Sequence, residues 1–535
     1  MQFGIKNLRR LRDVSPVELK PITLLVGRNS SGKSSFLRLF PLLRQSLMTR
    51  TSSPILWYGD LVDFGTYSTA VSSPSQQKEI CFSFVFDEIK IEPDYFWTDD
   101  GPLETIPADY TTVALDVVIG PADTIGPSEA ARTNVTSLSL TSADPDISFE
   151  LRVSSGQKVS ELRIDGVDAL RDFGSLGLQI TPGTILPEIL FVSSDSETAA
   201  VTRRRRTEGE FVPILMRLIR PHLPRNFKEE VLLDAVTELL SARAFSPTRM
   251  MRAAQNTNST RWRRFVADLA SGREPALFQK IRAVCAAIAL SDLLKRVDLQ
   301  LRNILSNVLY IGPARARSER YYRYQDLSVS EIDPDGKNFP MFLNSLSSYQ
   351  FRKLSEWIEE LFEYGISLHR EGGHISINLT AKGNISNIVD TGYGVSQILP
   401  VLAQIWWARS RPMSATPSRQ APFSLLAIEQ PELHLHPAHQ ALLADALVGE
   451  VGLSPESGGR FGSKINFLVE THSETLINRL GELVHSGSLN HRDVQILLFE
   501  PHPSGEHVTT VRTASFNEAG ELVDWPYGFF QPTVD

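Results

Sequence analysis

The residues at 27–34 have the types and the spacing that bind a nucleoside triphosphate. Their sequence, GRNSSGKS, fits the phosphate-binding P-loop pattern G-x-x-x-x-G-K-[S/T] at every fixed position. Glycines let the backbone wrap around phosphate oxygens, and the N-terminus of the following helix adds a favourable dipole. We therefore predict that ATP is bound by this loop and the residue after it: Gly27, Arg28, Asn29, Ser30, Ser31, Gly32, Lys33, Ser34 and Ser35.

Two side chains of the loop have specific expected roles. Lys33 is expected to reach the β- and γ-phosphates, and Ser34 is expected to ligate Mg²⁺. The flanking sequence supports this prediction, because ITLLVG at 22–27 is typical of a buried strand and 34–47 has helical spacing. The alternative is a Gly- and Ser-rich turn that carries a chance lysine.

A second segment, LLAIEQPELHLHP at 425–437, is an apolar strand that ends in an acidic residue. Beside a P-loop, this acid, Glu429, would bind Mg²⁺ directly or through water. The alternative for Glu429 is a solvated strand end. His434, His436 and His439 follow it, but no cysteine or further histidine has zinc-finger spacing, so a zinc site is disfavoured.

A third segment, FLVETHSE at 467–474, is another apolar strand followed by polar residues. A histidine at such a strand end, His472, can hydrogen-bond a γ-phosphate or position the attacking water. Taken alone, His472 has the alternative interpretation of a loop histidine with ordinary hydrogen bonds. Its place after a P-loop and an acidic strand favours the catalytic role.

A fourth segment, DTGYGVSQILPVLAQIW at 390–406, begins with glycines and continues with helical spacing. Gly392 and Gly394 precede a helix whose first turn contains Ser396 and Gln397, and such a helix entry binds anions. We predict that these four residues contact nucleotide. The alternative is a Gly-rich helix entry with no ligand, which is common.

The elements that must position these residues predict an α/β fold. Strands near both ends of the chain predict a parallel sheet that carries the P-loop. The β-rich segments from about 80 to 195 predict an antiparallel β lobe, and the helical spacing from about 208 to 305 predicts a helical insertion. The expected domains are the N-terminal part of the ATPase (1–90), the β lobe (91–200), the helical insertion (201–305) and the C-terminal part with a short tail domain (306–535).

The composition excludes several classes of protein. The chain has 535 residues, of which 42% are hydrophobic and 22% are charged, so a mainly disordered or fibrous chain is excluded. No run of ~18 apolar residues is present, which excludes a membrane span. Cys81 and Cys285 are too few for a disulfide framework. No export signal marks the N-terminus, so we expect a cytoplasmic location.

The net charge of −8 conceals two neighbouring segments of opposite charge. Residues 91–200 contain 19 Asp and Glu against 5 Lys and Arg, whereas residues 201–310 contain 10 against 20. Arginine binds phosphates through its planar fork, and Trp262 could stack on a base. The alternatives are a solvated face or a patch that pairs with the acidic lobe. The candidate DNA- or RNA-binding residues are Arg203, Arg204, Arg205, Arg206, Arg261, Trp262, Arg263 and Arg264.

Together and in this order, the four segments resemble the ABC-type ATPase head of SMC proteins and of OLD-like ATPases. The sequences FGIKNLRRL, DTGYGVSQILP, IEQPELHLHP and ETHSETLINRL resemble the OLD-like branch, members of which act in anti-phage defence. The tail at 513–530 resembles a short C-terminal domain of one subgroup. The resemblance covers about 1–70 and 306–535.

The resemblance implies that two heads enclose two ATP molecules, so it implies a homodimer or a higher even oligomer. The P-loop, Glu429 and His472 of one chain would face 392–397 of the other. Gln45 is one candidate for the family's glutamine loop. No nuclease module follows His472 and no long coiled coil is present, so the resemblance implies a separate nuclease or effector protein.

Three functions are consistent with these residues. We favour an ATP-driven dimeric switch that acts on nucleic acid or controls a nuclease or toxic effector in anti-phage defence. The alternatives are a scaffold that binds ATP without hydrolysing it and a stand-alone DNA-repair ATPase. A transporter subunit is disfavoured by the insertion at 90–305.

The residue after Glu429 is expected to slow hydrolysis. ABC ATPases usually have a glutamate there, which polarises the attacking water, whereas this chain has Gln430. An amide can orient water but cannot accept its proton at ordinary pH. Either Glu432 supplies a carboxylate, or His472 shares the work, or the site holds ATP in a closed dimer.

Overall fold

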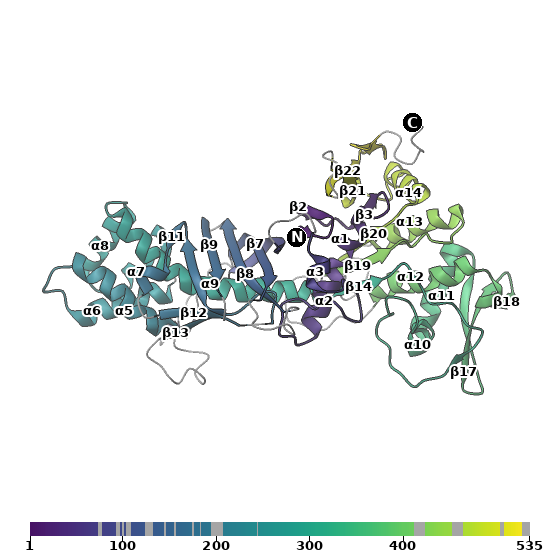
Figure 1. Ribbon diagram of the computed structural model, residues 1–535, viewed down its shortest axis with the longest axis horizontal. Coiled ribbons are helices and arrows are strands. Elements are labelled where there is room, and N and C mark those ends of the chain that lie inside the picture. The colour runs from purple at the N-terminus through teal and green to yellow at the C-terminus, as the bar shows by residue number, and fades with distance from the viewer. Residues whose placement is uncertain are drawn as a thin grey trace. The chain divides into compact units, whose positions relative to one another are not determined.

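The computed structural model (Figure 1) describes most of the chain, in ranges separated by gaps. The described residues are 1–72, 78–91, 97–98, 101–102, 109–122, 132–143, 146–154, 157–173, 176–181, 183–193, 207–242, 244–410, 423–451, 464–502 and 508–526. The chain forms two compact units. Unit 1 comprises Met1–Lys6, Arg50–Ile55 and Gln76–Leu301, and unit 2 comprises Asn7–Thr49, Leu56–Ser75 and Arg302–Asp535.

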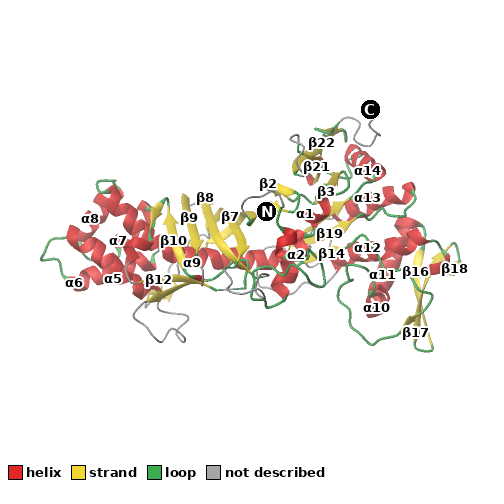
Figure 2. Ribbon diagram, in the orientation of Figure 1, coloured by secondary structure: helices red, strands yellow, loops and turns green. Residues whose placement is uncertain are grey.

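Unit 2 is built on a sheet with a parallel centre (Figure 2). Its strands are β2 (Leu11–Glu18), β3 (Ile22–Gly27), β14 (Val308–Ile311), β19 (Phe423–Glu429), β20 (Lys464–Glu470), β21 (Val494–Pro501), β22 (Thr509–Phe516) and β23 (Leu522–Val523). The order is β2-β22-β21-β3-β20-β19-β14, and β23 pairs with β22. All pairs from β21 to β14 are parallel, and β21 and β22 are antiparallel.

Helices cover both faces of this sheet. Every residue of β3 is buried, and successive strand residues point to opposite faces. The helices are α1 (Lys33–Leu37), α2 (Leu39–Met48), α3 (Tyr67–Ala70), α10 (Phe339–Ser345), α11 (Ser348–Phe362), α12 (Tyr393–Ser410), α13 (Pro437–Val451) and α14 (Glu474–His485). Helix α1 contacts β19 and β20, while α12 packs on β19 and α13 on β20. The strand ends beside α1 therefore meet at one edge of the sheet.

A small antiparallel sheet completes unit 2. It consists of β15 (Tyr322–Arg323), β16 (Gly365–Glu371), β17 (His374–Ala381) and β18 (Asn384–Asn387). Strand β17 lies between β16 and both β15 and β18. The segment after β18 leads directly into α12, so this sheet immediately precedes the helix that begins with the 390–397 residues.

Unit 1 contains an antiparallel sheet in the order β11-β10-β9-β8-β7-β4-β1. Its strands are β1 (Gln2–Leu8), β4 (Ile80–Ile91), β7 (Asp109–Pro121), β8 (Thr133–Ala143), β9 (Asp146–Val153), β10 (Val159–Ile164) and β11 (Val167–Asp168), with separate pairs β5 (Trp97–Thr98) with β6 (Gly101–Pro102) and β12 (Leu176–Ile180) with β13 (Ile189–Ser193). Alternate residues of β9, including Ile147, Phe149 and Leu151, are buried. One face of the sheet is therefore packed, as the alternation of apolar and polar residues requires.

The helices of unit 1 bury one residue, Trp262, that was predicted to contact nucleic acid. They are α4 (Leu170–Phe173), α5 (Thr207–Ile219), α6 (Glu229–Ser241), α7 (Pro247–Gln255), α8 (Thr260–Ala270) and α9 (Pro275–Ser306), of which the residues to Leu301 belong to unit 1. Trp262, Val266 and Leu269 follow the helical repeat on α8, and all three are buried. The prediction that Trp262 stacks on a base is wrong, because its indole is 0% exposed and packs beside Phe265.

The predicted α/β class is confirmed, with a P-loop on a parallel sheet, an antiparallel β lobe and a helical insertion. The acidic segment 91–200 and the basic segment as far as Leu301 both belong to unit 1, whereas Asn7–Thr49, Leu56–Ser75 and Arg302–Asp535 form unit 2. Within the described ranges, no helix combines the length and hydrophobicity that a bilayer crossing requires.

Candidate nucleotide site

The P-loop connects the end of β3 to the start of α1. Ser30 has a φ of 61° and Gly32 a φ of 99°, both in the left-handed region that glycine adopts without strain. Helix α1 begins at Lys33, directly after Gly32. Backbone N–H groups at such a turn and helix start point outward and bind anions. The loop thus has the local geometry that a phosphate requires.

Lys33 extends across this loop. Its Nζ donates hydrogen bonds to the carbonyl oxygens of Gly27 at 3.0 Å and Arg28 at 2.9 Å. The side chain is only 3% exposed, and burial lowers its pKa while Glu470 opposes the shift. The Lys33 ammonium group is therefore held in place by the backbone of the P-loop.

A cavity of about 580 Å³ opens on the P-loop. Its lining includes the loop, residues from two further strand ends and the arginines of a nearby turn and helix. The lining residues are Arg9, Arg10, Asn29, Ser30, Ser31, Gly32, Lys33, Ser34, Ser35, Arg38, Gln430, Glu470 and His472. The structure thus brings together most of the predicted P-loop contacts with Gln430 and His472. Sequence reasoning missed Arg9, Arg10, Arg38 and Glu470, although all four lie inside segments that it had singled out.

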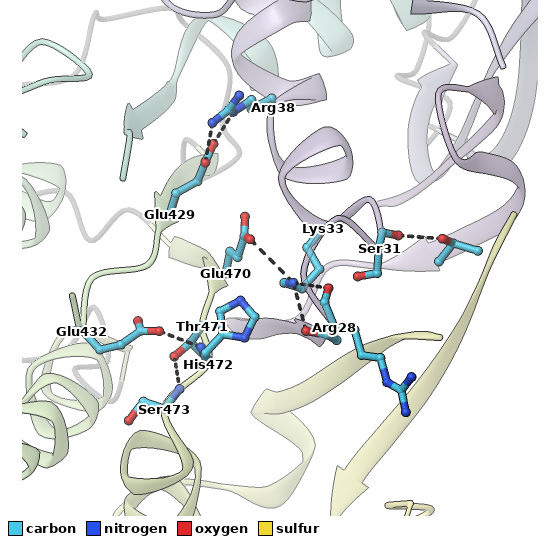
Figure 3. Close-up of polar contacts among 12 residues, drawn as sticks. Arg28, Ser31, Lys33, Arg38, Glu429, Glu432, Glu470, Thr471, His472 and Ser473 are labelled. Atoms are coloured by element: carbon cyan, nitrogen blue, oxygen red, sulfur yellow. Dashed lines mark hydrogen bonds and ion pairs between the residues drawn. The ribbon is translucent and has the colours of Figure 1, made fainter. Parts of the chain in front are cut away.

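Two carboxylates lie side by side at this edge of the sheet and have different partners (Figure 3). Glu429 and Glu470 are paired in register on the parallel strands β19 and β20. Glu429 Oε1 accepts from Arg38 Nε at 2.6 Å and from the Tyr310 hydroxyl at 2.7 Å, and its Oε2 accepts from Arg38 Nη2 at 2.8 Å. The predicted Mg²⁺ contact of Glu429 therefore does not match its position, because an arginine fork and a tyrosine already engage both oxygens.

Glu470 faces the P-loop instead. Its Oε1 lies 3.9 Å from Lys33 Nζ, and the side chain is 3% exposed. Burial raises the pKa of Glu470 to about 7, and a hydrogen bond with Ser34 opposes the rise. Among the described residues, Glu470 Oε2 has no hydrogen-bond partner. A buried carboxylate oxygen without a partner is costly unless a ligand or ion engages it.

The Ser34 hydroxyl and the Glu470 carboxylate are the kinds of ligand that a magnesium ion binds. Mg²⁺ prefers oxygen donors and is held in nucleotide sites by one or two protein groups, phosphates and water. The Ser34 hydroxyl and the unpartnered oxygen of Glu470 provide such donors on the wall of one cavity. The sequence signal that could have pointed to Glu470 is that the apolar run before it ends in glutamate, as does the run before Glu429.

The residues proposed to activate water have unequal access to the cavity. Gln430 lies on its wall in a left-handed conformation with a φ of 44°, and its N–H donates to the Glu470 carbonyl oxygen at 2.8 Å. His472 also lines the cavity, and burial lowers its pKa. Glu432 is 7% exposed and does not line the cavity. Its Oε1 accepts from the His472 N–H at 2.6 Å, so the position of Glu432 favours a role in positioning His472 over the alternative that it supplies the base.

Arg315 stabilises the turn that follows β19 by binding its backbone. Its Nη2 donates to the carbonyl oxygens of Glu429 at 3.0 Å and Gln430 at 3.5 Å. Burial lowers the pKa of Arg315 to about 10, while Glu432 and Glu429 oppose the shift. Sequence reasoning missed this residue, because an arginine that binds backbone carbonyls has no motif.

The 390–397 segment contains both exposed and buried residues. Ser396 and Gln397 are buried, and they donate to the carbonyl oxygens of Tyr393 and Ala316. The first turn of α12 thus points these two side chains into the fold, and their contact with nucleotide stays a prediction. Gly394 packs on the 430–435 turn so closely that a Cβ would overlap the His434 carbonyl oxygen. Gly392 is exposed just before α12.

The remaining candidates have structural surroundings. Gln45 is 4% exposed, and its amide bonds to the backbone of Leu56, Leu61 and Val62, so it fixes that loop and does not reach the cavity. His434 packs against Tyr393, and His439 against Phe362. Within the described part of the chain, no group of three or more His, Cys, Asp or Glu is arranged to hold a metal ion.

The basic cluster is only partly described. Arg203–Arg206 lie outside the described residues. Arg261, Arg263 and Arg264 are exposed on α8. Arg263 donates to the carbonyl oxygens of Gln255 and Thr257, and Arg261 donates to Asn226.

Comparison with known proteins gives one family match. Residues 312–477 match the family model described as AAA ATPase domain. The segment contains the 390–397 residues and both strand-end acids, while the P-loop reaches the same sheet edge through β3. No curated protein matches the chain.

Two solved structures are similar to the chain at low identity. The SMC head domain from Thermotoga maritima is 9% identical with a TM-score of 0.30, over 96% of this chain and 97% of that one. The recombination mediator protein RecF-ATPrS in the RecFOR pathway is 10% identical with a TM-score of 0.25, over 95% and 97%. Both TM-scores are low, so the assignment depends on the family match and the P-loop cavity. Together these show that residues 312–477 are similar to an ATPase domain and that a P-loop cavity lies at the same edge of the sheet.

Proposed function

We propose that the chain is an ABC-type, OLD-like ATPase that binds ATP and Mg²⁺, hydrolyses ATP slowly and acts as a dimeric switch. The observation that carries the proposal is the cavity on which Lys33, Gln430, Glu470 and His472 converge from three strand ends. A P-loop lysine beside two further strand ends is the arrangement that phosphoryl-transfer enzymes use.

The residues of the cavity divide the work of binding. Backbone N–H groups of the P-loop and the start of α1 hold phosphate oxygens, and Lys33 supplies a fixed positive charge at the β- and γ-phosphates. Ser34 and a strand-end carboxylate would hold Mg²⁺, which neutralises charge that develops on the phosphates. Arg9 and Arg10 add positive charge to the wall.

Slow hydrolysis follows from the groups that can touch water. Gln430 orients a water molecule by hydrogen bonds but does not accept its proton. His472 is held by Glu432 at its backbone and has a lowered pKa, so it is mainly neutral at pH 7 and able to accept a hydrogen bond. Among the described residues, the cavity thus lacks the glutamate that ABC ATPases usually place after the strand-end acid. This favours a long-lived ATP-bound state.

The dimer and the cellular role are further parts of the proposal. No residue of 390–397 lines the described cavity, so a second copy would have to bring this segment to the nucleotide. The exposed backbone of Gly392 at the start of α12 supports such a contact. We propose that the assembled dimer acts in the cytoplasm on DNA or RNA, or controls a separate nuclease or effector in anti-phage defence. A non-hydrolysing scaffold is the second candidate, favoured by Gln430, and a DNA-repair ATPase is the third.

The test is nucleotide binding by Lys33→Ala, measured by calorimetry with a slowly hydrolysed ATP analogue. We expect affinity to fall ~100-fold or more, because no other lysine lines the cavity among the described residues. Lys353→Ala is the matched control, since Lys353 is exposed on α11 and pairs with Glu356. Wild-type affinity in Lys33→Ala would refute the nucleotide site.

A further inference from the structure

We propose that Glu470, and not Glu429, is the carboxylate that faces the Mg²⁺ of the bound nucleotide, with Glu429 serving as a structural anchor for Arg38. The inference rests on the proposed nucleotide site and assigns one residue within it. It starts from two glutamates that end neighbouring parallel strands in register.

Glu429 is committed to protein partners. Its side chain is 2% exposed, and Arg38 binds both of its oxygens while Tyr310 binds one of them. A bidentate arginine–carboxylate pair is among the strongest polar contacts in proteins. To reach a metal, Glu429 would have to abandon Arg38 in a half-buried position, which has a large cost. Both oxygens of Glu429 are therefore engaged by protein groups and are not free to bind a metal ion.

Glu470 has the opposite surroundings. Strand β20 lies between β19 and the P-loop strand β3, so Glu470 is one strand nearer to the phosphates than Glu429. It lines the cavity, contacts Ser34 and lies 3.9 Å from Lys33 Nζ. Its Oε2 has no partner within the described structure. Figure 3 shows its carboxylate directed toward Lys33 while that of Glu429 is directed toward Arg38.

The two glutamates thus separate the tasks of one acidic site. Arg38 neutralises Glu429, so Glu470 is the carboxylate that remains available beside Ser34 and Lys33. Hydroxyl and carboxylate oxygens on adjoining elements are the donors that Mg²⁺ accepts in nucleotide sites. The cation would also balance Glu470 against the nucleotide phosphates, which would otherwise repel it.

The experiment compares the Mg²⁺ dependence of nucleotide binding in Glu470→Gln and Glu429→Gln. Calorimetry gives the Kd of a slowly hydrolysed ATP analogue with Mg²⁺ and with a chelator. The Kd with chelator divided by the Kd with Mg²⁺ measures how strongly the cation promotes nucleotide binding. We expect Glu470→Gln to reduce this ratio at least about 10–100-fold, the range that mutation of groups surrounding a metal site produces. Glu429→Gln should keep the ratio within about twofold of wild type and lower the Tm, because it weakens the Arg38 pair.

Direct metal binding gives a second measurement. Mn²⁺ replaces Mg²⁺, and its electron paramagnetic resonance signal reports the bound fraction in the nucleotide complex. Glu470→Gln should release Mn²⁺ at concentrations where Glu429→Gln retains it. If Glu470→Gln does not fold, Glu470→Asp keeps the charge but withdraws it by one methylene, and a reduced ratio is still expected.

The outcomes separate this inference from the proposed function. A wild type that binds no nucleotide under either condition overturns both. If the wild type binds nucleotide but Glu470→Gln leaves the ratio unchanged, only the assignment of Glu470 is overturned. The same holds for Glu470→Asp where that variant replaces Glu470→Gln. A reduction in Glu429→Gln that equals or exceeds that in Glu470→Gln returns the role to Glu429.

Discussion

Two groups of cations in this molecule differ in how they are held. Around the P-loop, Arg9, Lys33 and Arg38 are at least partly buried, and all three line one cavity. On α8 in unit 1, Arg261 and Arg263 are exposed and bond to nearby loops. Four basic residues, Arg9, Arg10, Lys33 and Arg38, line the P-loop cavity, whereas only Arg261 of the three α8 arginines lines a cavity of similar size in unit 1. Convergence of side chains, and not their density along the chain, distinguishes an anion site from a solvated face.

Partners of opposite charge show the same contrast. Arg38 is matched by the buried Glu429, whereas Arg263 relies on backbone carbonyls at 3.1 Å. Arg9 lies over the ring of Phe64 at 4.5 Å, and its pKa is lowered by burial and by Arg38. A lowered pKa in a crowded group of cations means that an incoming anion would relieve repulsion. The following variants test this difference, in order of expected effect.

The largest effect should come from Trp262→Ala. Removal of a fully buried indole costs about 3–5 kcal/mol, because a large cavity remains. Denaturant unfolding of the variant should therefore show a clearly lower stability of unit 1. Tryptophan fluorescence is unsuitable as the only probe, so circular dichroism should be recorded as well. A change below ~1 kcal/mol would mean that Trp262 is not part of the helical core.

A smaller loss is expected for Arg38→Ala. Glu429 would remain buried with Tyr310 alone, and we expect a loss of about 2–3 kcal/mol, reduced from the fully buried case because Arg38 is partly exposed. Arg264→Ala is the matched arginine on α8 and should stay within about 0.5 kcal/mol of wild type. Equal losses in the two variants would remove the distinction between the two cation groups.

Gln430→Glu should raise ATP hydrolysis by about tenfold or more, since it adds a proton acceptor to the cavity wall. Glu432→Gln should lower the remaining rate, because Glu432 positions the His472 backbone. Steady-state phosphate release measures both. A wild-type rate near ~10 s⁻¹, ordinary for enzymes, would contradict the slow-switch proposal.

The smallest effect on stability is expected from neutralising Arg261, Arg263 and Arg264 together with Arg203–Arg206. If these side chains contact phosphates, the variant should bind nucleic acid more weakly. The slope of log K against log salt concentration should become shallower by about 0.7–0.9 for each phosphate contact that is lost. Fluorescence anisotropy with short DNA and RNA at several salt concentrations measures this. If the wild type binds neither at low salt, the cluster is a solvated face or a protein-docking surface.

The sequence was most informative where topology restricts chemistry. The P-loop fixed the positions of Lys33 and Ser34, and the apolar runs before Glu429 and His472 placed both at the same sheet edge. The partner of each carboxylate was not predictable, since it depends on Arg38, which belongs to a segment 391 residues away from Glu429. Likewise, the spacing within 392–397 did not reveal which face of α12 is buried.

The position of β3 in the sheet has a consequence for synthesis of the chain. Its neighbours β20 and β21 begin at Lys464 and Val494, so the P-loop strand acquires its hydrogen-bonded partners only after more than 400 further residues are made. At ~5–20 residues per second, that interval lasts roughly 20–90 s. The apolar strand at 22–27 must remain unpaired with these partners throughout, and closure over such a sequence separation is slow. Nascent chains should therefore depend on chaperones during this interval, and ribosome-bound fragments that end before 464 should be unable to retain nucleotide.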